Sequence, residues 1–316
     1  MNISYSNPLS RGWDRMKKAL FQPFDIGKWF TVGFTAFLAA LVDGGSPGGN
    51  GNYSNRFKDG NFDWDEVANF PYVAWEWLNS NVFWFTLIIV GIIVLFAIIV
   101  ILVWLSSRGK FMFLDNVAHD KAEVVNPWND YSREGDSLFV WRLIFGFIIF
   151  IVFMASAAFS FIFIIDLFNS GTPLSEQVFS IFGLILQFLV LVIITAYISL
   201  FLNDFVVPIM YKNKISASEA WHQFLPILKQ YPGHFILYGL FIFVLMILVV
   251  LTVILFGLFT CCVGFLFLLI PYIGSVLFLP ISYTFRAFSV EFLEQFGDEF
   301  AIFPTDEVDQ EALSTE

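Results

Sequence analysis

The chain has 316 residues, of which 58% are hydrophobic and 42 are phenylalanine, and its mean hydropathy is +0.76. A soluble protein of this size cannot bury so much apolar surface, so we expect lipid to cover the remainder. The formal net charge of −11 argues against a nucleic-acid-binding protein, which would carry a basic surface.

The first predicted element is an amphipathic helix that ends at Pro23, and Asp25 is expected to cap the helix that follows. Its apolar residues recur at helical spacing and include Trp13. Its polar side is basic, which suits the anionic head groups of membrane lipids, and carries Arg11, Arg15, Lys17 and Lys18. We expect this helix to lie on the membrane surface with the ring of Trp13 in contact with lipid.

Six apolar runs follow the first helix, and crossing the hydrocarbon core takes about 20 apolar residues. One run is only marginally long enough. The sequence predicts an all-α, polytopic membrane helix bundle of six transmembrane helices arranged as three hairpins. The runs are 26–42, 82–105, 138–165, 177–202, 235–262 and 263–285.

The predicted organisation is a membrane domain over residues 1–290 and an acidic cytoplasmic tail over residues 291–316. Within the membrane domain, residues 43–81 form an external loop that is rich in glycine and then in aromatic residues. The tail carries carboxylates but no Lys or Arg, and its end is predicted to be disordered.

Each hairpin is preceded by a cytoplasmic amphipathic helix with one tryptophan: Trp13, Trp128 or Trp221. The third of these helices begins with a capping box, Ser216-Ala-Ser-Glu219. Predicted breaks are Pro23, Gly135 and Pro232-Gly233, and Ser137 is expected to cap the third membrane helix. We expect Trp128 to contact protein because its helix is short and nearly neutral, whereas for Trp221 both lipid and protein contact remain open.

Basic residues predict the orientation, because Lys and Arg accumulate on cytoplasmic segments. With the N-terminus inside, 14 of the 16 basic residues are cytoplasmic, and only Arg56 and Lys58 are external. The sequence therefore predicts a multi-pass protein of the cell (cytoplasmic) membrane with both termini inside.

The apolar runs contain few ionisable residues. Arg142 lies at a membrane edge, where its side chain is expected to extend to the cytoplasmic surface. A polar stripe on the fourth run has two open interpretations, hydrogen bonding between helices and the lining of a path; it consists of Gln187, Thr195, Ser199 and Asn203. Asp115 and His119 lie one helical turn apart without an evident third metal ligand. No catalytic, cofactor or metal site is predicted.

Several segments together resemble a group of uncharacterised prokaryotic integral membrane proteins, which are similar to the membrane domain of some glycerophosphodiester phosphodiesterases. The segments are GWDRMKKALFQPFDIGKWF, RGKFMFLDNV, NPWNDYSREGDSLFVWR, NDFVVPIMYKNKISASEAW and PYIGSVLFLPISYTFRAFSVEFL. The resemblance implies a membrane fold, and no catalytic residue is carried over by it.

These observations favour a non-enzymatic integral membrane protein that organises lipids or a membrane partner. The expected partners are membrane lipids and a membrane protein, with no nucleic acid and no cofactor. The alternative is a transporter or channel for a weakly polar or lipid-like molecule. An intramembrane enzyme is the third hypothesis, and the sequence shows no phosphate-binding loop or nucleophile motif to favour it.

Overall fold

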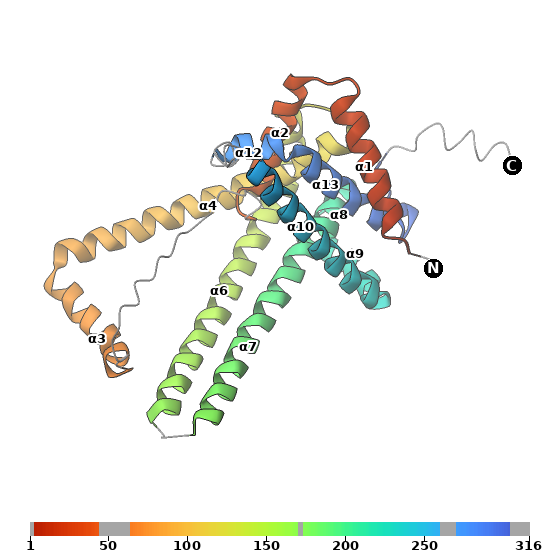
Figure 1. The fold of residues 1–316 in the computed structure, drawn as a ribbon. Helices are drawn as coiled ribbons and strands as arrows, with labels where there is room; N and C mark the ends of the chain where they lie inside the picture. Colours follow the sequence, from red (N-terminus) through yellow and green to blue (C-terminus); the bar gives the residue numbers. More distant parts are fainter. Residues whose placement is uncertain (1–2, 44–63, 170–172, 260–269, 304–316) are drawn as a thin grey trace, which may run out of the picture. The chain divides into compact units, whose positions relative to one another are not determined.

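The computed structural model describes residues 3–43, 64–169, 173–259 and 270–303 (Figure 1). All regular secondary structure in these ranges is helical, which confirms the predicted all-α class. Much of the predicted external loop, the junction of the fifth and sixth predicted spans, and the end of the acidic tail lie outside the described residues.

Four helices of the described chain are long and apolar enough to cross a membrane. A helix rises about 1.5 Å per residue, so each exceeds the roughly 30 Å of a hydrocarbon core. They are α4 (Val82–His119), α6 (Ser132–Asn169), α7 (Leu174–Phe201) and α10 (Pro232–Phe259).

The other two predicted spans have a different form. The first is α2 (Ile26–Ala40), which has only 15 residues. The last is interrupted at Phe278, where α12 (Pro271–Leu277) ends and α13 (Leu279–Glu294) begins. Pro280 near the start of α13 has no N–H to continue a hydrogen-bonded helix, which accounts for the interruption. The six-span arrangement is therefore not confirmed.

The chain divides into two compact units. Unit one comprises residues 1–49, 102–142 and 197–316, and unit two comprises residues 50–101 and 143–196. The 14 basic residues that the sequence analysis assigned to the cytoplasmic side all belong to unit one.

Unit two contains α3 (Trp64–Ser80) and long apolar segments of α4, α6 and α7. Phe153 of α6 and Phe188 of α7 lie 6.3 Å apart between ring centroids. Most large apolar side chains of these segments are exposed; Phe83 and Phe179, for example, are 72% and 78% exposed. Such a surface is unfavourable in water and suits a hydrocarbon environment.

In unit one, α1 (Ser6–Phe21) packs along α13 (Figure 1). The two backbones approach closely at Gly12, where a Cβ atom would lie 3.0 Å from the backbone N of Phe288 and 3.1 Å from the carbonyl O of Thr284. Met16 and Leu20 of α1 are also buried and belong to the hydrophobic core of unit one. This contact fixes which sides of α1 remain accessible.

The centre of unit one is an aromatic cluster around Phe205, which is fully buried. Phe205 lies in η1 (Leu202–Val206), a π-helical turn between α7 and α8 (Val207–Asn213). Its ring stacks on Phe224 of α9 (Ala217–Gln230) at 5.3 Å and meets Phe235 of α10 edge-on at 5.0 Å. Pro208 follows η1 and has no N–H to donate, which favours the irregular turn.

Helix α2 runs antiparallel to the last part of α4. At its start, Lys28 Nζ lies 2.8 Å from Asp120 Oδ1, and at its end the carbonyl of Ala39 accepts a hydrogen bond from Ser106 Oγ (2.9 Å). The sequence analysis put this part of α4 on the cytoplasmic side and the end of α2 on the external side. This contact is a further reason why the six-span arrangement lacks support.

Several predicted helix boundaries are confirmed. Asp25 caps α2 by accepting hydrogen bonds from the N–H groups of Gly27 and Lys28. The capping box of α9 forms between Ser216 and Glu219. Helix α10 begins at Pro232, as the Pro-Gly break predicts.

The predicted break at Gly135 is wrong. A short helix, α5 (Val125–Asp130), ends before it, and α6 continues through Gly135, whose N–H donates to the carbonyl of Tyr131 (2.9 Å). Glycine is needed here for space, because a Cβ atom would lie 2.8 Å from Cγ of Arg108. Ser137 therefore does not cap a helix, and its Oγ accepts a hydrogen bond from the N–H of Ala217 (3.0 Å).

The chain remains packed beyond the predicted tail boundary. Residue 290 falls inside α13, and Glu291 is buried. A short 3-10 helix, η2 (Asp298–Phe300), follows. Phe300 and Phe303 contribute to the hydrophobic core of unit one.

Candidate functional site

A group of charged and polar side chains lies in unit one, with Lys110 and Tyr238 buried, Asp43 exposed at the edge and the others half-buried. We call this group the charge cluster; its members are Asp43, Lys110, Arg142, Asn203, Asp204, Tyr238 and Arg286. Lys110 is 2% exposed, and its ammonium group donates to the carboxylate of Asp43 and to the side-chain oxygen of Asn203. Arg142 donates through Nη2 to Asp43 Oδ1 (2.6 Å). Asp43 therefore forms ion pairs with both Lys110 and Arg142.

Asp43 follows α2, and the two cations that pair with it come from α4 and α6. Burial alone would raise the pKa of the Asp43 carboxyl, but the positive charges of Lys110 and Arg142 lower that pKa below its ordinary value of 3.8. Arg142 also donates through Nη1 to Ser106 Oγ (3.0 Å). The three segments are thus joined by charge-assisted hydrogen bonds, which are stronger than neutral ones.

The second half of the charge cluster surrounds η1. Tyr238 of α10 donates its hydroxyl to Asp204 Oδ2 (2.9 Å). Arg286 of α13 donates through Nη1 to the carbonyl of Asn203 (2.7 Å), while its buried Nε has no partner among the described residues. The cluster holds three basic and two acidic side chains, so it carries excess positive charge when all five are ionised.

The structure brings together two of the residues singled out in the sequence, Arg142 and Asn203. Arg142 is not extended to the surface as expected, because its side chain is 10% exposed and paired with Asp43. The sequence analysis missed the remaining members. Lys110 and Asp43 each border an apolar run, but nothing in their spacing of 67 positions indicates that they meet.

The other three residues of the predicted polar stripe lie outside the charge cluster. Gln187 donates through Nε2 to Ser156 Oγ of α6 (2.6 Å), a hydrogen bond between helices within unit two. Thr195 donates to the carbonyl of Leu191 in its own helix (2.8 Å). Ser199 is half-buried in unit one. The stripe is thus divided between a helix–helix contact and the charge cluster.

The three tryptophans of the lead helices have different surroundings. Trp13 is 48% exposed. The ring of Trp128 meets Trp104 edge-on at 5.5 Å, and the guanidinium of Arg108 lies 5.0 Å from its centroid. Trp221 stacks on Trp141 at 5.6 Å. Protein therefore supplies ring partners to the second and third, whereas half of Trp13 stays accessible.

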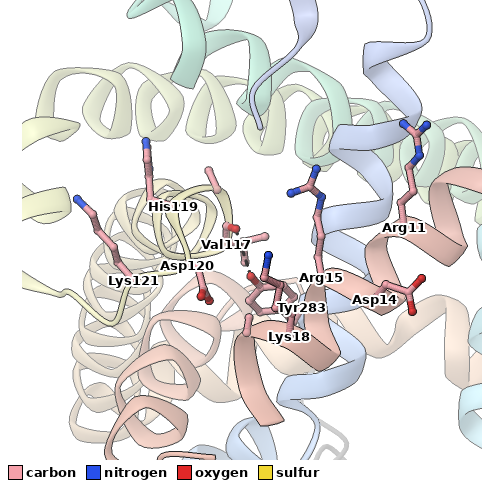
Figure 2. Close-up of a pocket in the computed structure, with 11 residues that line it drawn as sticks. Arg11, Asp14, Arg15, Lys18, Val117, His119, Asp120, Lys121 and Tyr283 are labelled. Carbon is pink, nitrogen blue, oxygen red and sulfur yellow. Dashed lines mark hydrogen bonds between the residues drawn. The ribbon is translucent and has the colours of Figure 1, made fainter. Parts of the chain in front are cut away.

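A second feature of unit one is a hollow of about 530 Å³, which we call the basic hollow (Figure 2). Figure 2 shows side chains of α1 on one side and those of the turn after α4 on the other. Tyr283 of α13 lies between them. The charged and ionisable residues that line the hollow are Arg11, Asp14, Arg15, Lys18, His119, Asp120 and Lys121.

Asp115 and His119, the pair noted in the sequence, lie near this hollow. Asp115 Oδ1 accepts a hydrogen bond from the Tyr211 hydroxyl (2.7 Å) and is 3.2 Å from His119 Nδ1. Among the described residues, no group of three or more His, Cys, Asp or Glu side chains is placed to hold a metal ion. The pair instead takes part in a hydrogen-bonded contact with α8.

Fold and sites together define an all-helical protein with four candidate membrane spans and a compact, charge-bearing unit. Residues 7–301 match the model of a family described as "Family of unknown function (DUF7544)", so the chain belongs to this family. No curated protein and no solved structure matches the chain. These comparisons provide no link to the membrane domain of glycerophosphodiester phosphodiesterases.

Proposed function

We propose that this chain is a non-enzymatic integral membrane protein that organises lipids through its N-terminal helix. The observation that carries the proposal is the position of α1, whose buried side rests on α13 and whose other sides remain accessible. A helix with one apolar and one basic accessible side is suited to the boundary between acyl chains and anionic head groups.

The apolar side of α1 borders a groove of about 360 Å³, lined by Ser6, Leu9, Ser10, Trp13, Phe241 and Thr284. Phe241 comes from α10, one of the four candidate membrane spans. Tryptophan favours the membrane interface because its ring is apolar and its N–H is polar. The groove and the exposed face of Trp13 thus support contact with lipid.

The basic side of α1 supports contact with lipid head groups. Arg11 and Lys18 are exposed, and Arg15 is half-buried beside them. Each basic residue near an anionic membrane surface contributes about 1 kcal/mol to binding. The opposite chemistry of the two accessible sides therefore favours one orientation of α1 at the interface.

Spin labels on the two sides of α1 test this function. Ser6→Cys places a label beside the apolar groove, and Lys18→Cys places one at the basic hollow, about 120° further round the helix. In full-length protein in bilayers, with Cys261 and Cys262 replaced by serine, the label at position 6 should collide mainly with oxygen, and that at position 18 with a water-soluble nickel reagent. Equal access of the nickel reagent to both labels would rule the proposal out.

For location, we propose the cell membrane, with both termini on the cytoplasmic side. The gathering of 14 basic residues in unit one supports this orientation. Whether the chain crosses the membrane six times as three hairpins, and whether it is related to the membrane domain of glycerophosphodiester phosphodiesterases, both stay hypotheses.

A transporter or channel is the second candidate function. The observation that favours it is the charge cluster, because buried ionisable groups in a membrane protein are costly and often serve transport. The hydrogen bond between Gln187 and Ser156 argues against a transporter, because it engages polar groups that would have to face a transport path. A membrane-protein partner, the other role expected of the first candidate, remains compatible with either function.

A further inference from the structure

We propose that the basic hollow binds a phosphate group, carried either by a lipid head group or by a free phosphate ion. The proposal deepens the lipid-organising function and rests on it for the nearness of lipid. The carrying observation is that cations from two segments distant in the sequence, α1 and the turn after α4, line one space (Figure 2).

The charges that line the hollow are unbalanced. Its permanent cations are Arg11, Arg15, Lys18 and Lys121, and its carboxylates are Asp14 and Asp120. Both carboxylates are engaged by lysines outside the lining: Lys17 lies 2.9 Å from Asp14, and Lys28 lies 2.8 Å from Asp120. The local charge is therefore positive in a chain whose formal net charge is −11.

Glu291 compensates only part of this positive charge. It is buried beneath α1, and its carboxylate lies 2.7 Å from Arg15 Nε and 3.5 Å from Arg11 Nη1. Lys18 and Lys121 have no ion-pair partner within the part of the chain that the structure describes. An anion placed between them would complete the electrostatic balance.

The cations are held on ordered segments. Arg15 is oriented by Glu291 and by the ring of Phe303, whose centroid lies 3.9 Å from the guanidinium carbon. Asp120 adopts a left-handed conformation with φ 54°, and the next N–H, that of Lys121, donates to the carbonyl of Asn116 (3.1 Å). Asp120 and Lys121, the two residues at this turn, both line the hollow. A pre-ordered site loses less entropy on binding.

Phosphate fits this arrangement better than a single carboxylate. A volume of about 530 Å³ is within the usual range for small-ligand sites. Arginine presents several donors in a fixed plane that matches phosphate oxygens, and lysine adds a point charge. A phosphate monoester carries up to two negative charges and three acceptor oxygens, which suits several cations at once.

The test uses full-length protein in nanodiscs of phosphatidylcholine, which has no net charge. One arm titrates inorganic phosphate by calorimetry. The other arm replaces part of the lipid with phosphatidic acid or, as a comparison, phosphatidylglycerol, and measures the lipid retained with the protein by native mass spectrometry. Phosphate binding without retained phosphatidic acid assigns a free phosphate ligand, and selective retention of phosphatidic acid, with or without phosphate binding, assigns a lipid head group.

Two matched double variants distinguish binding at the basic hollow from attraction to the general surface charge. The double variant Lys18→Gln/Lys121→Gln should weaken binding in the positive arm by about tenfold or more, since it removes two charge-assisted contacts. The control Arg133→Gln/Lys229→Gln removes the same charge from positions outside the hollow and should change binding less than about twofold.

Equal weakening of binding by both double variants would contradict a phosphate site in the basic hollow, and so would the absence of binding in both arms. Neither result affects the labels at positions 6 and 18, which test the interfacial position of α1 itself. Failure of the phosphate site is therefore distinguishable from failure of the proposed function.

Discussion

Arg142 Nη2 lies 2.6 Å from Asp43 Oδ1, although 99 positions separate the two residues in the sequence. The same carboxylate accepts a hydrogen bond from the ammonium group of Lys110. Asp43 therefore joins the end of α2 to α4 and α6, and two cations depend on it for a counter-charge.

We expect Asp43→Asn to lower the free energy of unfolding by about 3 kcal/mol, because it leaves two buried cations without their carboxylate. Unfolding of the detergent-solubilised protein by sodium dodecyl sulfate measures the change. The control is Asp14→Asn, which removes an exposed carboxylate paired with Lys17 and should cost less than about 1 kcal/mol. Equal costs for the two variants would show that the charge cluster does not stabilise unit one.

The pH dependence of the free energy of unfolding should reflect the ionisation of Asp43. The pKa of Asp43 is lower in the folded protein than its ordinary value of 3.8, so the folded state favours the ionised form. This contribution is present above pH 3.8 and is lost as the pH falls through the lower, folded pKa. The stability difference between the wild-type protein and Asp43→Asn should therefore shrink on acidification below about pH 4.

Thermal unfolding of both proteins from neutral to acidic pH measures that difference. Other carboxylates titrate in both proteins and cancel in the comparison. A difference that stays constant, or grows, as the pH falls below the ordinary carboxyl range would contradict the assignment of the low pKa to Asp43.

The contact between α2 and α4 gives a third prediction. A Cβ atom at Gly109 would lie 2.6 Å from Leu38 Cβ and 2.7 Å from the backbone N of Ala39, so Gly109→Ala requires the helices to separate. We expect a loss of about 1–3 kcal/mol in the free energy of unfolding, typical of overpacking. Gly91 lies in the same helix, and a Cβ atom added there would meet nothing within 4 Å, so Gly91→Ala is the matched control.

Denaturant titration compares the two alanine variants with the wild-type protein. Gly91→Ala should be neutral or slightly stabilising, because alanine has the higher helix propensity. If Gly109→Ala is also neutral, α2 does not pack closely against α4.

The sequence predicted helix starts correctly where the capping side chain and its partners are close in the sequence. Asp25 and the Ser216–Glu219 capping box each begin a helix, because the side chain and the N–H groups that it satisfies are within three residues. Gly135 misled the analysis because its role is set by Arg108, a residue of another helix that needs the space.

The charge cluster could not be predicted for a similar reason. The apolar runs were defined by hydropathy. Arg142 was assigned to a membrane edge and Lys110 to the cytoplasmic segment after the second run, and at both places basic residues usually reach water. Their pairing with Asp43 depends on α2 turning back along α4, which no periodic pattern encodes. The basic helix α1 was predicted, but the basic hollow also needs His119 and Lys121, which hydropathy does not connect to it.

The polar contact between α6 and α7 gives a fourth prediction, which concerns transport. Because Gln187 is hydrogen-bonded to Ser156, we expect Gln187→Ala to weaken the helix–helix contact by about 1 kcal/mol without altering any ion flux. Purified protein in liposomes should carry no current under an imposed proton or sodium gradient. A reproducible gradient-driven current that Gln187→Ala abolishes would favour the transporter over the lipid-organising function.

The measurement that tests the central claim most directly is the quenching of single-tryptophan variants by brominated phosphatidylcholine. Trp13 is 48% exposed beside an apolar groove, whereas Trp128 packs against Trp104 and Arg108. With α1 at the membrane interface, Trp13 should be quenched strongly and Trp128 weakly. Equal quenching of the two, or no quenching of Trp13, would contradict the account of α1 as a lipid-organising helix.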